Sequence, residues 1–228
     1  MQEKENDMLY KAVIFDMDGT ILDTLDDLTG SINHALRLHG FPERRRDEVR
    51  SFLGNGMVQL VHLSVPEGSS KESEEAVLAE HACYYPLHSC DLTRPYAGIV
   101  GLLQQLKSDG IKTAVVSNKS DSNVRSLVMR FFDGLFDVSI GSTKELARKP
   151  AADMVDLALD RLGITNAEAV YIGDSEVDLQ TAANARLPMI TVTWGFRDRE
   201  FLQDHGAGVL ASSPEEVLQL IRDAKVDH

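Results

Sequence analysis

Apolar residues follow two different spacings along this chain. At its start, and again beyond residue 95, short continuous apolar runs alternate with segments whose apolar residues recur every three or four positions. The runs are typical of buried strands, and the spaced segments are typical of helices with one buried face. We therefore expect strands at 12–15, 113–117, 136–140, 169–172, 189–192 and 209–210.

The segments between these strands predict helices of ordinary length, at 99–106, 124–131, 154–162 and 179–185. A last helix begins where Ser213 and Glu216 form a capping box and Pro214 occupies the first turn. Strands that alternate with helices in this way predict an α/β fold, in which a Rossmann-like parallel sheet carries helices on both faces.

Residues 23–91 break this alternation. Their apolar positions predict helices only, separated by turns at 54–56 and 66–68. The first of these helices starts at Asp23 or Thr24 and stops at Gly40. We therefore predict a core domain of residues 1–22 and 92–228, and a helical domain of residues 23–91 inserted after the first strand. Hinges between the two are expected near residues 22–23 and 94–95.

The composition limits the class of protein. A net charge of −13 and a pI near 4.9 argue against nucleic acid and anionic membranes as partners. No apolar stretch approaches the roughly 18 residues that span a bilayer, and residues 1–8 are too polar for a signal peptide. We expect a cytoplasmic protein whose first seven residues form a disordered tail. Cys83 and Cys90 give no disulfide framework.

Two acids directly follow the first predicted strand. Asp16 and Asp18 lie on the same side of an extended chain because they are two positions apart. Their charges repel each other, so a cation or a proton is needed between them. Gly19 allows a sharp turn, and Thr20 adds a hydroxyl. This pentapeptide therefore offers a nucleophile, an acid or base, and ligands for a metal ion.

Polar residues also follow the other predicted strands, at the edge of the sheet where α/β proteins bind ligands. Ser117 and Asn118 follow the second strand, Lys149 comes after the third, and Asp174 and Asp178 come after the fourth. Each has a simpler interpretation. Ser117 or Asn118 could cap a helix, Lys149 could be a solvated surface group, and the acids could favour a helix N-terminus.

The combination is more specific than its members. Asp16 and Asp174, with Asp178 close by, are the hard oxygen ligands that Mg²⁺ prefers. No grouping of cysteine and histidine competes as a transition-metal site, because Cys83 and Cys90 are roughly 10 Å apart along a helix. We therefore expect Mg²⁺ as the cofactor.

These residues, in this order, resemble the four motifs of the haloacid dehalogenase superfamily. Residues 16–20 resemble its first motif, Ser117 its second, Lys149 its third and residues 173–178 its fourth. The helical insertion resembles the cap that many of its members carry after the first motif. The nearest resemblance is to its phosphoglycolate phosphatases, from which Ser117 and Phe196 depart, because threonine and tyrosine are common there.

The resemblance implies a mechanism. Asp16 attacks phosphorus and forms an aspartyl-phosphate, while Asp18 protonates the leaving oxygen and later activates water. Mg²⁺ is held by the Asp16 carboxylate, the Asp18 backbone carbonyl and Asp174. The residues expected to contact the phosphoryl group or the substrate are Thr20, Gly54, Asn55, Ser117, Asn118 and Lys149. Those expected to support the metal ligands are Ser175 and Asp178.

Asp18 also separates the chemistries known in this superfamily. Dehalogenases lack this second aspartate, so its presence favours phosphoryl transfer. Residues 57–59 contain no lysine for the Schiff base of a phosphonatase. Residues 26–28 contain no histidine of the β-phosphoglucomutase type, which ranks a mutase below a hydrolase.

We therefore expect a Mg²⁺-dependent phosphatase for a small phosphorylated metabolite, with 2-phosphoglycolate as the leading substrate, acting as a monomer or homodimer. Two alternatives stay open. One is a pyrophosphatase, or a nucleotide or sugar-phosphate phosphatase, on the same fold. The other is a catalytically silent binding protein. The turn at 54–56 either bends the inserted helices toward the substrate or simply connects two helices.

Overall fold

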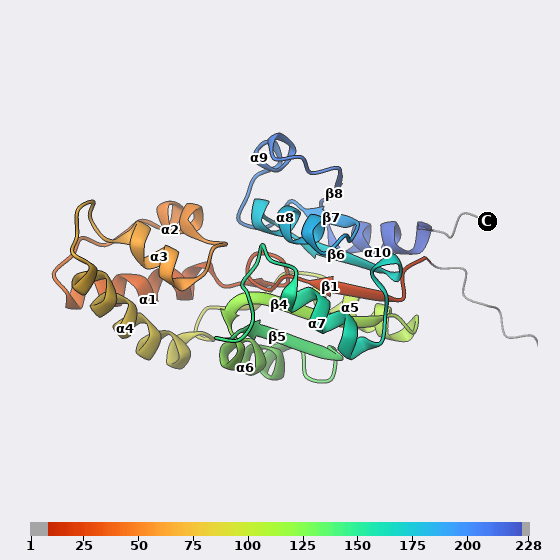
Figure 1. Ribbon diagram of the computed structural model, residues 1–228, viewed down its shortest axis with the longest axis horizontal. Helices are drawn as coiled ribbons and strands as arrows, with labels where there is room; N and C mark the ends of the chain where they lie inside the picture. The colour runs from red at the N-terminus through yellow and green to blue at the C-terminus, as the bar shows by residue number, and fades with distance from the viewer. Residues whose placement is uncertain (1–8, 225–228) are drawn as a thin grey trace, which may run out of the picture.

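The computed structural model describes residues 9–224, and the tail expected for residues 1–7 lies outside them. Within these residues the main sheet has six parallel strands in the order β5-β4-β1-β6-β7-β8 (Figure 1). The expected α/β fold with a Rossmann-like sheet is therefore confirmed. The strands are β1 (Ala12–Phe15), β4 (Lys112–Ser120), β5 (Val138–Ser142), β6 (Ala169–Gly173), β7 (Met189–Val192) and β8 (Val209–Ala211).

The central strand β1 shows why both faces of the sheet are covered. Val13 and Phe15 pack on one side, against α5 (Ile99–Ser108), α6 (Asp121–Phe131) and α10 (Pro214–Asp223). Ala12 and Ile14 pack on the other side, against α7 (Asp153–Leu162) and α8 (Glu176–Asn184). Because successive side chains of a strand point to opposite faces, a strand buried on both faces needs a continuous apolar run.

Four helices lie together at one end of the sheet (Figure 1). They are α1 (Leu25–Leu38), α2 (Arg46–Phe52), α3 (Met57–Ser64) and α4 (Lys71–His88), and we call them the cap. The cap has an apolar core of its own, in which Ile32 and Leu36 of α1 meet Leu60 of α3 and Val77 of α4. The spacing that predicts these helices is therefore explained by their packing on one another.

Two short connections join the cap to the rest of the chain. They form a second, two-stranded sheet in which β2 (Leu22–Asp23) pairs antiparallel with β3 (Arg94–Pro95). The Asp27 side chain accepts hydrogen bonds from the backbone nitrogens of Leu92 and Thr93, at 2.9 and 2.8 Å, and so fixes α1 to the return connection. These are the segments expected to act as hinges. Movement of the cap about them stays a prediction.

The structure differs from the predicted elements at several points. The strand expected at 136–140 is shifted to Val138–Ser142, because Phe136 packs edge-on against Phe15 and Phe132 instead of joining the sheet. Strand β4 continues three residues past its expected end, to Ser120. The short helices α9 (Arg199–Asp204) and η1 (Asn166–Glu168) have no counterpart among the predicted elements, because so few residues show no period.

Within residues 9–224, no helix is both long enough and apolar enough to span a bilayer.

Candidate active site

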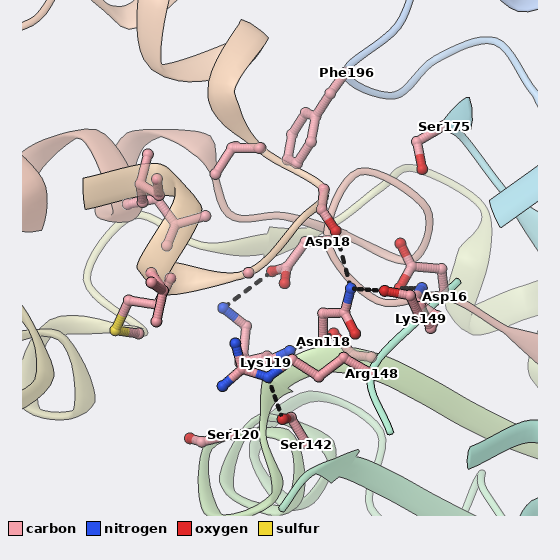
Figure 2. Close-up of a pocket in the computed structure, with 18 of the residues that line it drawn as sticks. Asp16, Asp18, Asn118, Lys119, Ser120, Ser142, Arg148, Lys149, Ser175 and Phe196 are labelled. Carbon is pink, nitrogen blue, oxygen red and sulfur yellow. Dashed lines mark hydrogen bonds and ion pairs between the residues drawn. The ribbon is translucent and has the colours of Figure 1, made fainter. Parts of the chain in front are cut away.

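A cavity of about 330 Å³ lies between the cap and the carboxyl ends of β1, β4 and β6. Its core side is lined by Asp16 and Asp18 after β1, by Ser117 and Asn118 in β4, and by Lys149, Asp174 and Ser175. Figure 2 shows Asp16, Asn118 and Lys149 close together in this part of the cavity. The parallel strands explain this convergence, because all their carboxyl ends meet at one edge of the sheet. The structure thus brings together side chains that are up to about 160 positions apart in the sequence.

Lys149 is the cation at the centre of the site. Its Nζ donates to Asp16 Oδ1 at 2.6 Å, to Asp178 Oδ1 at 2.8 Å and to the Tyr171 hydroxyl at 3.1 Å. Burial alone would lower the pKa of Lys149, but the charges of Asp16 and Asp178 outweigh it and raise that pKa well above its usual range. Lys149 is therefore a buried, charged group and not a solvated surface lysine.

Three carboxylates crowd around this lysine. One ligand atom from each of Asp16, Asp174 and Asp178 lies within 4.8 Å of the others. Burial, followed by the charge of Asp178, raises the pKa of Asp174 to about 7 and raises the pKa of Asp16 well above its ordinary value. Three acids beside one lysine leave an excess of negative charge, and a divalent cation would relieve it.

The hydrogen bonds indicate which acids are available to such a cation. Asp178 is fully engaged: Lys149 and Tyr171 donate to its Oδ1, and the Ser175 hydroxyl donates to its Oδ2 at 2.5 Å. Among residues 9–224, Asp16 Oδ2 accepts no hydrogen bond. Asp174 accepts one hydrogen bond on each oxygen, whereas Asp178 accepts two on each, so the Asp174 oxygens keep a free lone pair. Asp16 and Asp174 therefore fit as direct ligands of Mg²⁺, while Asp178 and Ser175 fit a supporting role.

Glycines make room for two of these acids. A Cβ built on Gly19 or on Gly195 would lie 2.3 Å from Asp174 Oδ2, and one on Gly173 would lie 2.4 Å from Asp178 Cγ. Side chains at these positions would displace the carboxylates. Two hydrogen bonds also hold the Asp174 carboxylate. The Thr20 hydroxyl donates to Oδ1 at 2.9 Å, and the Phe196 backbone nitrogen donates to Oδ2 at 2.7 Å.

Asp18 lies apart from the three crowded acids. Its Oδ1 accepts a hydrogen bond from the Thr24 hydroxyl at 2.7 Å and faces Lys119 Nζ at 3.2 Å (Figure 2). Its side chain is 22% exposed and lines the cavity. Asp16 and Asp18 thus have separate cations, Lys149 and Lys119, which resolves the repulsion expected from their spacing.

Lys119 is a residue whose role sequence reasoning missed. It is buried at the end of β4, and besides Asp18 it contacts Tyr85 of the cap. Lys119 directly follows Ser117 and Asn118 in the sequence. A lysine at the end of a strand does not by itself reveal that it contacts Tyr85, which is 34 positions away. Tyr171 was hidden in a similar way, because its aromatic ring fits the apolar run of β6 and only its hydroxyl reaches Lys149.

Ser117 and Asn118 do not cap the following helix, because they lie within β4 and α6 begins at Asp121. The Asn118 amide nitrogen donates to the carbonyl of Gly54 in the cap, at 3.1 Å, and to that of Lys149, at 3.0 Å. It therefore connects the cap turn to the loop that carries Lys149. Ser117 is buried and lines the cavity.

The remaining candidates lie at different distances from the cavity. Gly54 lines it, but Asn55 is exposed and is not one of the lining residues. Thr20 is fully buried behind Asp174. Contacts of Thr20, Gly54 and Asn55 with a substrate stay predictions.

The cap side of the cavity has a chemistry of its own. Every lining residue that the cap provides is apolar or glycine: Leu28, Leu53, Gly54, Gly56, Met57, Val58, Leu60, Leu78 and Ala82. Facing them from the core is Arg148, whose Nε donates to Ser142 Oγ at 2.9 Å (Figure 2). Within residues 9–224 its guanidinium has no carboxylate partner, so it is available to an anionic group of a ligand.

Core side chains also hold the cap in place through its backbone. Arg197 Nη1 and Nη2 donate to the carbonyls of Arg50 and Leu53, at 3.1 and 2.9 Å. In return the Arg50 side chain donates to the Gly195 carbonyl at 3.0 Å. Arg197 also forms an ion pair with Glu176 at 2.8 Å, which orients it. The cap is therefore closed over the cavity.

Comparison with known proteins agrees with this arrangement. Residues 13–192 match the haloacid dehalogenase-like hydrolases. The chain is 33% identical over 190 residues to a phosphoglycolate phosphatase of Rhodobacter capsulatus, which covers 82% of this chain and 85% of the relative. It is 30% identical over 223 residues to an N-acetylmuramic acid 6-phosphate phosphatase of Pseudomonas aeruginosa, which covers 96% and 98%.

Solved structures show the same fold. The crystal structure of a candidate phosphoglycolate phosphatase from Lactobacillus delbrueckii matches with a TM-score of 0.90 and 38% sequence identity. The match covers 94% of this chain and 99% of the other. The sheet and the cap therefore both have counterparts in that structure.

Proposed function

Because this chain belongs to the haloacid dehalogenase-like hydrolases, we propose that it is a Mg²⁺-dependent phosphatase that works through an aspartyl-phosphate on Asp16. One observation carries the proposal. Asp16 is a buried carboxylate 2.6 Å from Lys149, next to Asp174, at the floor of a cavity. An anionic nucleophile that attacks a phosphate ester needs such positive charge beside it.

The proposed reaction has two steps, transfer of the phosphoryl group to Asp16 and hydrolysis of the acyl phosphate that results. An Asp16 oxygen attacks phosphorus, the bond from phosphorus to the ester oxygen breaks, and Asp18 gives its proton to that oxygen. Water then attacks the phosphorus of the acyl phosphate and loses a proton to Asp18. The bond between phosphorus and Asp16 breaks, and inorganic phosphate leaves.

Other residues of this chain bind and orient the reacting groups. Lys149 holds the Asp16 carboxylate and lies where it can contact the phosphoryl oxygens, and the Ser117 hydroxyl lines the same end of the cavity. Mg²⁺ at Asp16 and Asp174 would offset the charge of the nucleophile and of the phosphoryl group. Asp178 keeps Lys149 and the Ser175 turn in position.

We infer that the substrate is a small phosphorylated metabolite, with 2-phosphoglycolate first. The apolar cap wall offers few partners for a ligand with many hydroxyls, and Arg148 offers its guanidinium to a carboxylate. The Rhodobacter relative is named for this substrate. A sugar phosphate is the second candidate, because the Pseudomonas relative is named for N-acetylmuramic acid 6-phosphate.

A substrate panel tests the proposal. Purified protein with Mg²⁺ should hydrolyse p-nitrophenyl phosphate, and kcat/KM should be highest for 2-phosphoglycolate in a panel with pyrophosphate, nucleoside monophosphates and sugar phosphates. Asp16→Asn should lose at least about 1,000-fold in kcat. Asp198→Asn is the matched control, since asparagine also caps α9 and the position lies outside the cavity lining.

Two results would contradict this proposal. Unchanged turnover in Asp16→Asn would exclude the aspartyl-phosphate. A lack of any hydrolysis across the panel, with Mg²⁺ still bound, would favour a silent binding protein on this fold.

A further inference from the structure

We propose that Lys119 and Tyr85 are positioning residues that aim the Asp18 carboxylate at the leaving oxygen, so that docking of the cap prepares the acid. The inference rests on the proposed phosphatase function. It starts from a chain of three residues in contact, which begins in the core and ends in the cap: Asp18, Lys119 and Tyr85.

The contacts of Lys119 are short and buried. Its Nζ donates to the Tyr85 hydroxyl at 2.8 Å, faces Asp18 Oδ1 at 3.2 Å and lies 4.4 Å from the centre of the Tyr85 ring. The lysine is 8% exposed and the tyrosine 0%. A buried ammonium group with two fixed acceptors and an aromatic ring against it has little freedom to move.

These contacts distinguish the two oxygens of Asp18. Thr24 Oγ1 donates to Oδ1 at 2.7 Å, and Lys119 faces the same oxygen. Among residues 9–224, Oδ2 accepts no hydrogen bond. The carboxylate is therefore anchored by Oδ1, and Oδ2 is the oxygen that can carry a proton to the substrate.

The charge of Lys119 also suits the direction of the proton transfer. When Oδ2 gives its proton to the ester oxygen, Asp18 becomes a carboxylate 3.2 Å from an ammonium group. That pairing stabilises the product of the transfer. When water loses its proton to Asp18 in the second step, the same anchor returns Oδ2 to its starting position.

The position of Tyr85 links this arrangement to the cap. Tyr85 is in α4 and belongs to the apolar core of the cap, while Lys119 is in β4 and Asp18 follows β1. If the cap moves away, Lys119 loses an acceptor and the cover that keeps water from its ion pair. The acid is then fully oriented only when the cap is docked.

The test uses leaving groups that differ in their need for a proton. Ethyl phosphate releases a strongly basic alkoxide, while 2,4-dinitrophenyl phosphate releases a stable phenolate that needs no proton. We expect Tyr85→Phe to lower kcat/KM for ethyl phosphate about tenfold, and to change it less than about twofold for the dinitrophenyl ester, which requires no general acid. Lys119→Met should give the same pattern with a larger loss.

Tyr84→Phe is the matched control. Tyr84 precedes Tyr85 in α4, stacks on the rings of His34 and His88, and does not line the cavity. This variant should behave like the unmodified protein with both esters. In an Asp18→Asn background, Tyr85→Phe should have no further effect, because the group that it positions is absent.

The outcomes are distinct. Equal losses with both esters, or no loss in Tyr85→Phe, would overturn the positioning role while the unmodified protein remains a phosphatase. If the unmodified protein hydrolyses neither ester nor any substrate of the panel, the proposed function fails, and the role of Asp18 fails with it.

Discussion

At the scale of single residues, the acids of this site depend on neighbours that have no side chain. Gly19 and Gly195 approach Asp174 so closely that a methyl group on either would overlap its carboxylate. Gly19 also has a φ of +87°, a conformation that other residues rarely adopt, whereas Gly195 has no such constraint. Gly195 therefore separates the effect of space from the effect of backbone strain.

Gly195→Ala should damage the proposed Mg²⁺ site without unfolding the protein. The new Cβ would lie 2.3 Å from Asp174 Oδ2, so the carboxylate must shift. Since a displacement of about 1 Å can cost about 100-fold in rate, we expect a loss of this order in kcat/KM and a higher Mg²⁺ requirement. The measurement is a Mg²⁺ titration of activity, together with thermal unfolding.

Gly208→Ala provides the control. Gly208 also lies outside the helices and has no positive φ, and a Cβ there would meet no atom within 4 Å. It should leave activity and Mg²⁺ requirement unchanged. Equal behaviour of the two variants would contradict the close fit around Asp174.

Most of the acidic site could be predicted from the sequence, because Asp16 and Asp174 closely follow predicted strands and Lys149 comes after another. Lys119 and Tyr171 could not be predicted in the same way. Each reveals its role only through a partner brought close by folding, Tyr85 in one case and Lys149 in the other. No local pattern records such pairs.

At the scale of elements, the sequence predicts the strands and helices whose apolar residues recur at a regular spacing. It does not predict very short helices or shifts in the ends of a strand. The strands and long helices follow the spacing of their apolar residues. The shift of β5 to Val138–Ser142 depends on Phe136 finding aromatic partners in the core, and α9 has only six residues. Long-range packing decides both, so a local pattern cannot.

The connection between α2 and the loop after β7 leads to a prediction about cap closure. Arg197→Lys removes the guanidinium group, whose two Nη atoms donate to the carbonyls of Arg50 and Leu53. We expect the cap to open more often, which should raise KM about tenfold, equivalent to about 1.4 kcal/mol of hydrogen bonding. Amides of α2 should also exchange hydrogen faster, as mass spectrometry can measure.

Arg199→Lys is the matching control, since Arg199 lies two residues further on, in α9, and does not contact the cap in the described structure. Its KM and exchange should match those of the unmodified protein. Unchanged exchange in Arg197→Lys would show that these hydrogen bonds do not hold the cap.

At the scale of the whole molecule, we expect the proposed metal binding and folding stability to be linked through Asp174. Its pKa is raised from 3.8 to about 7 in the folded, metal-free protein, first by burial and then by Asp178. A raised carboxyl pKa stabilises the fold below the unfolded value of 3.8, and this contribution is lost as the pH rises through about 7. In the proposed site, Mg²⁺ would take the place of the proton on Asp174.

Mg²⁺ should therefore stabilise the protein more at pH 8 than at pH 5. At a concentration 100 times its Kd, the gain at pH 8 should be about 2.7 kcal/mol, and it should be smaller at pH 5, where protons compete for Asp174. Thermal unfolding with Mg²⁺ or with EDTA at both pH values measures this. An equal gain at both pH values, or an undiminished gain in Asp174→Asn, would argue against this ligand.

The docking contacts have a consequence for changing this protein in the laboratory. Asn118 and Arg197 of the core grip the cap by the carbonyls of Gly54, Arg50 and Leu53. Carbonyls are present whatever the side chains, so docking is insensitive to the cap's own sequence at these points. Among the apolar cap residues that line the cavity, Val58 and Ala82 lie outside the apolar core of the cap, so these two can be varied in a library while the docking contacts are kept. Such a library would change which phosphate ester fits the cavity, while the residues at the carboxyl ends of the strands stay the same.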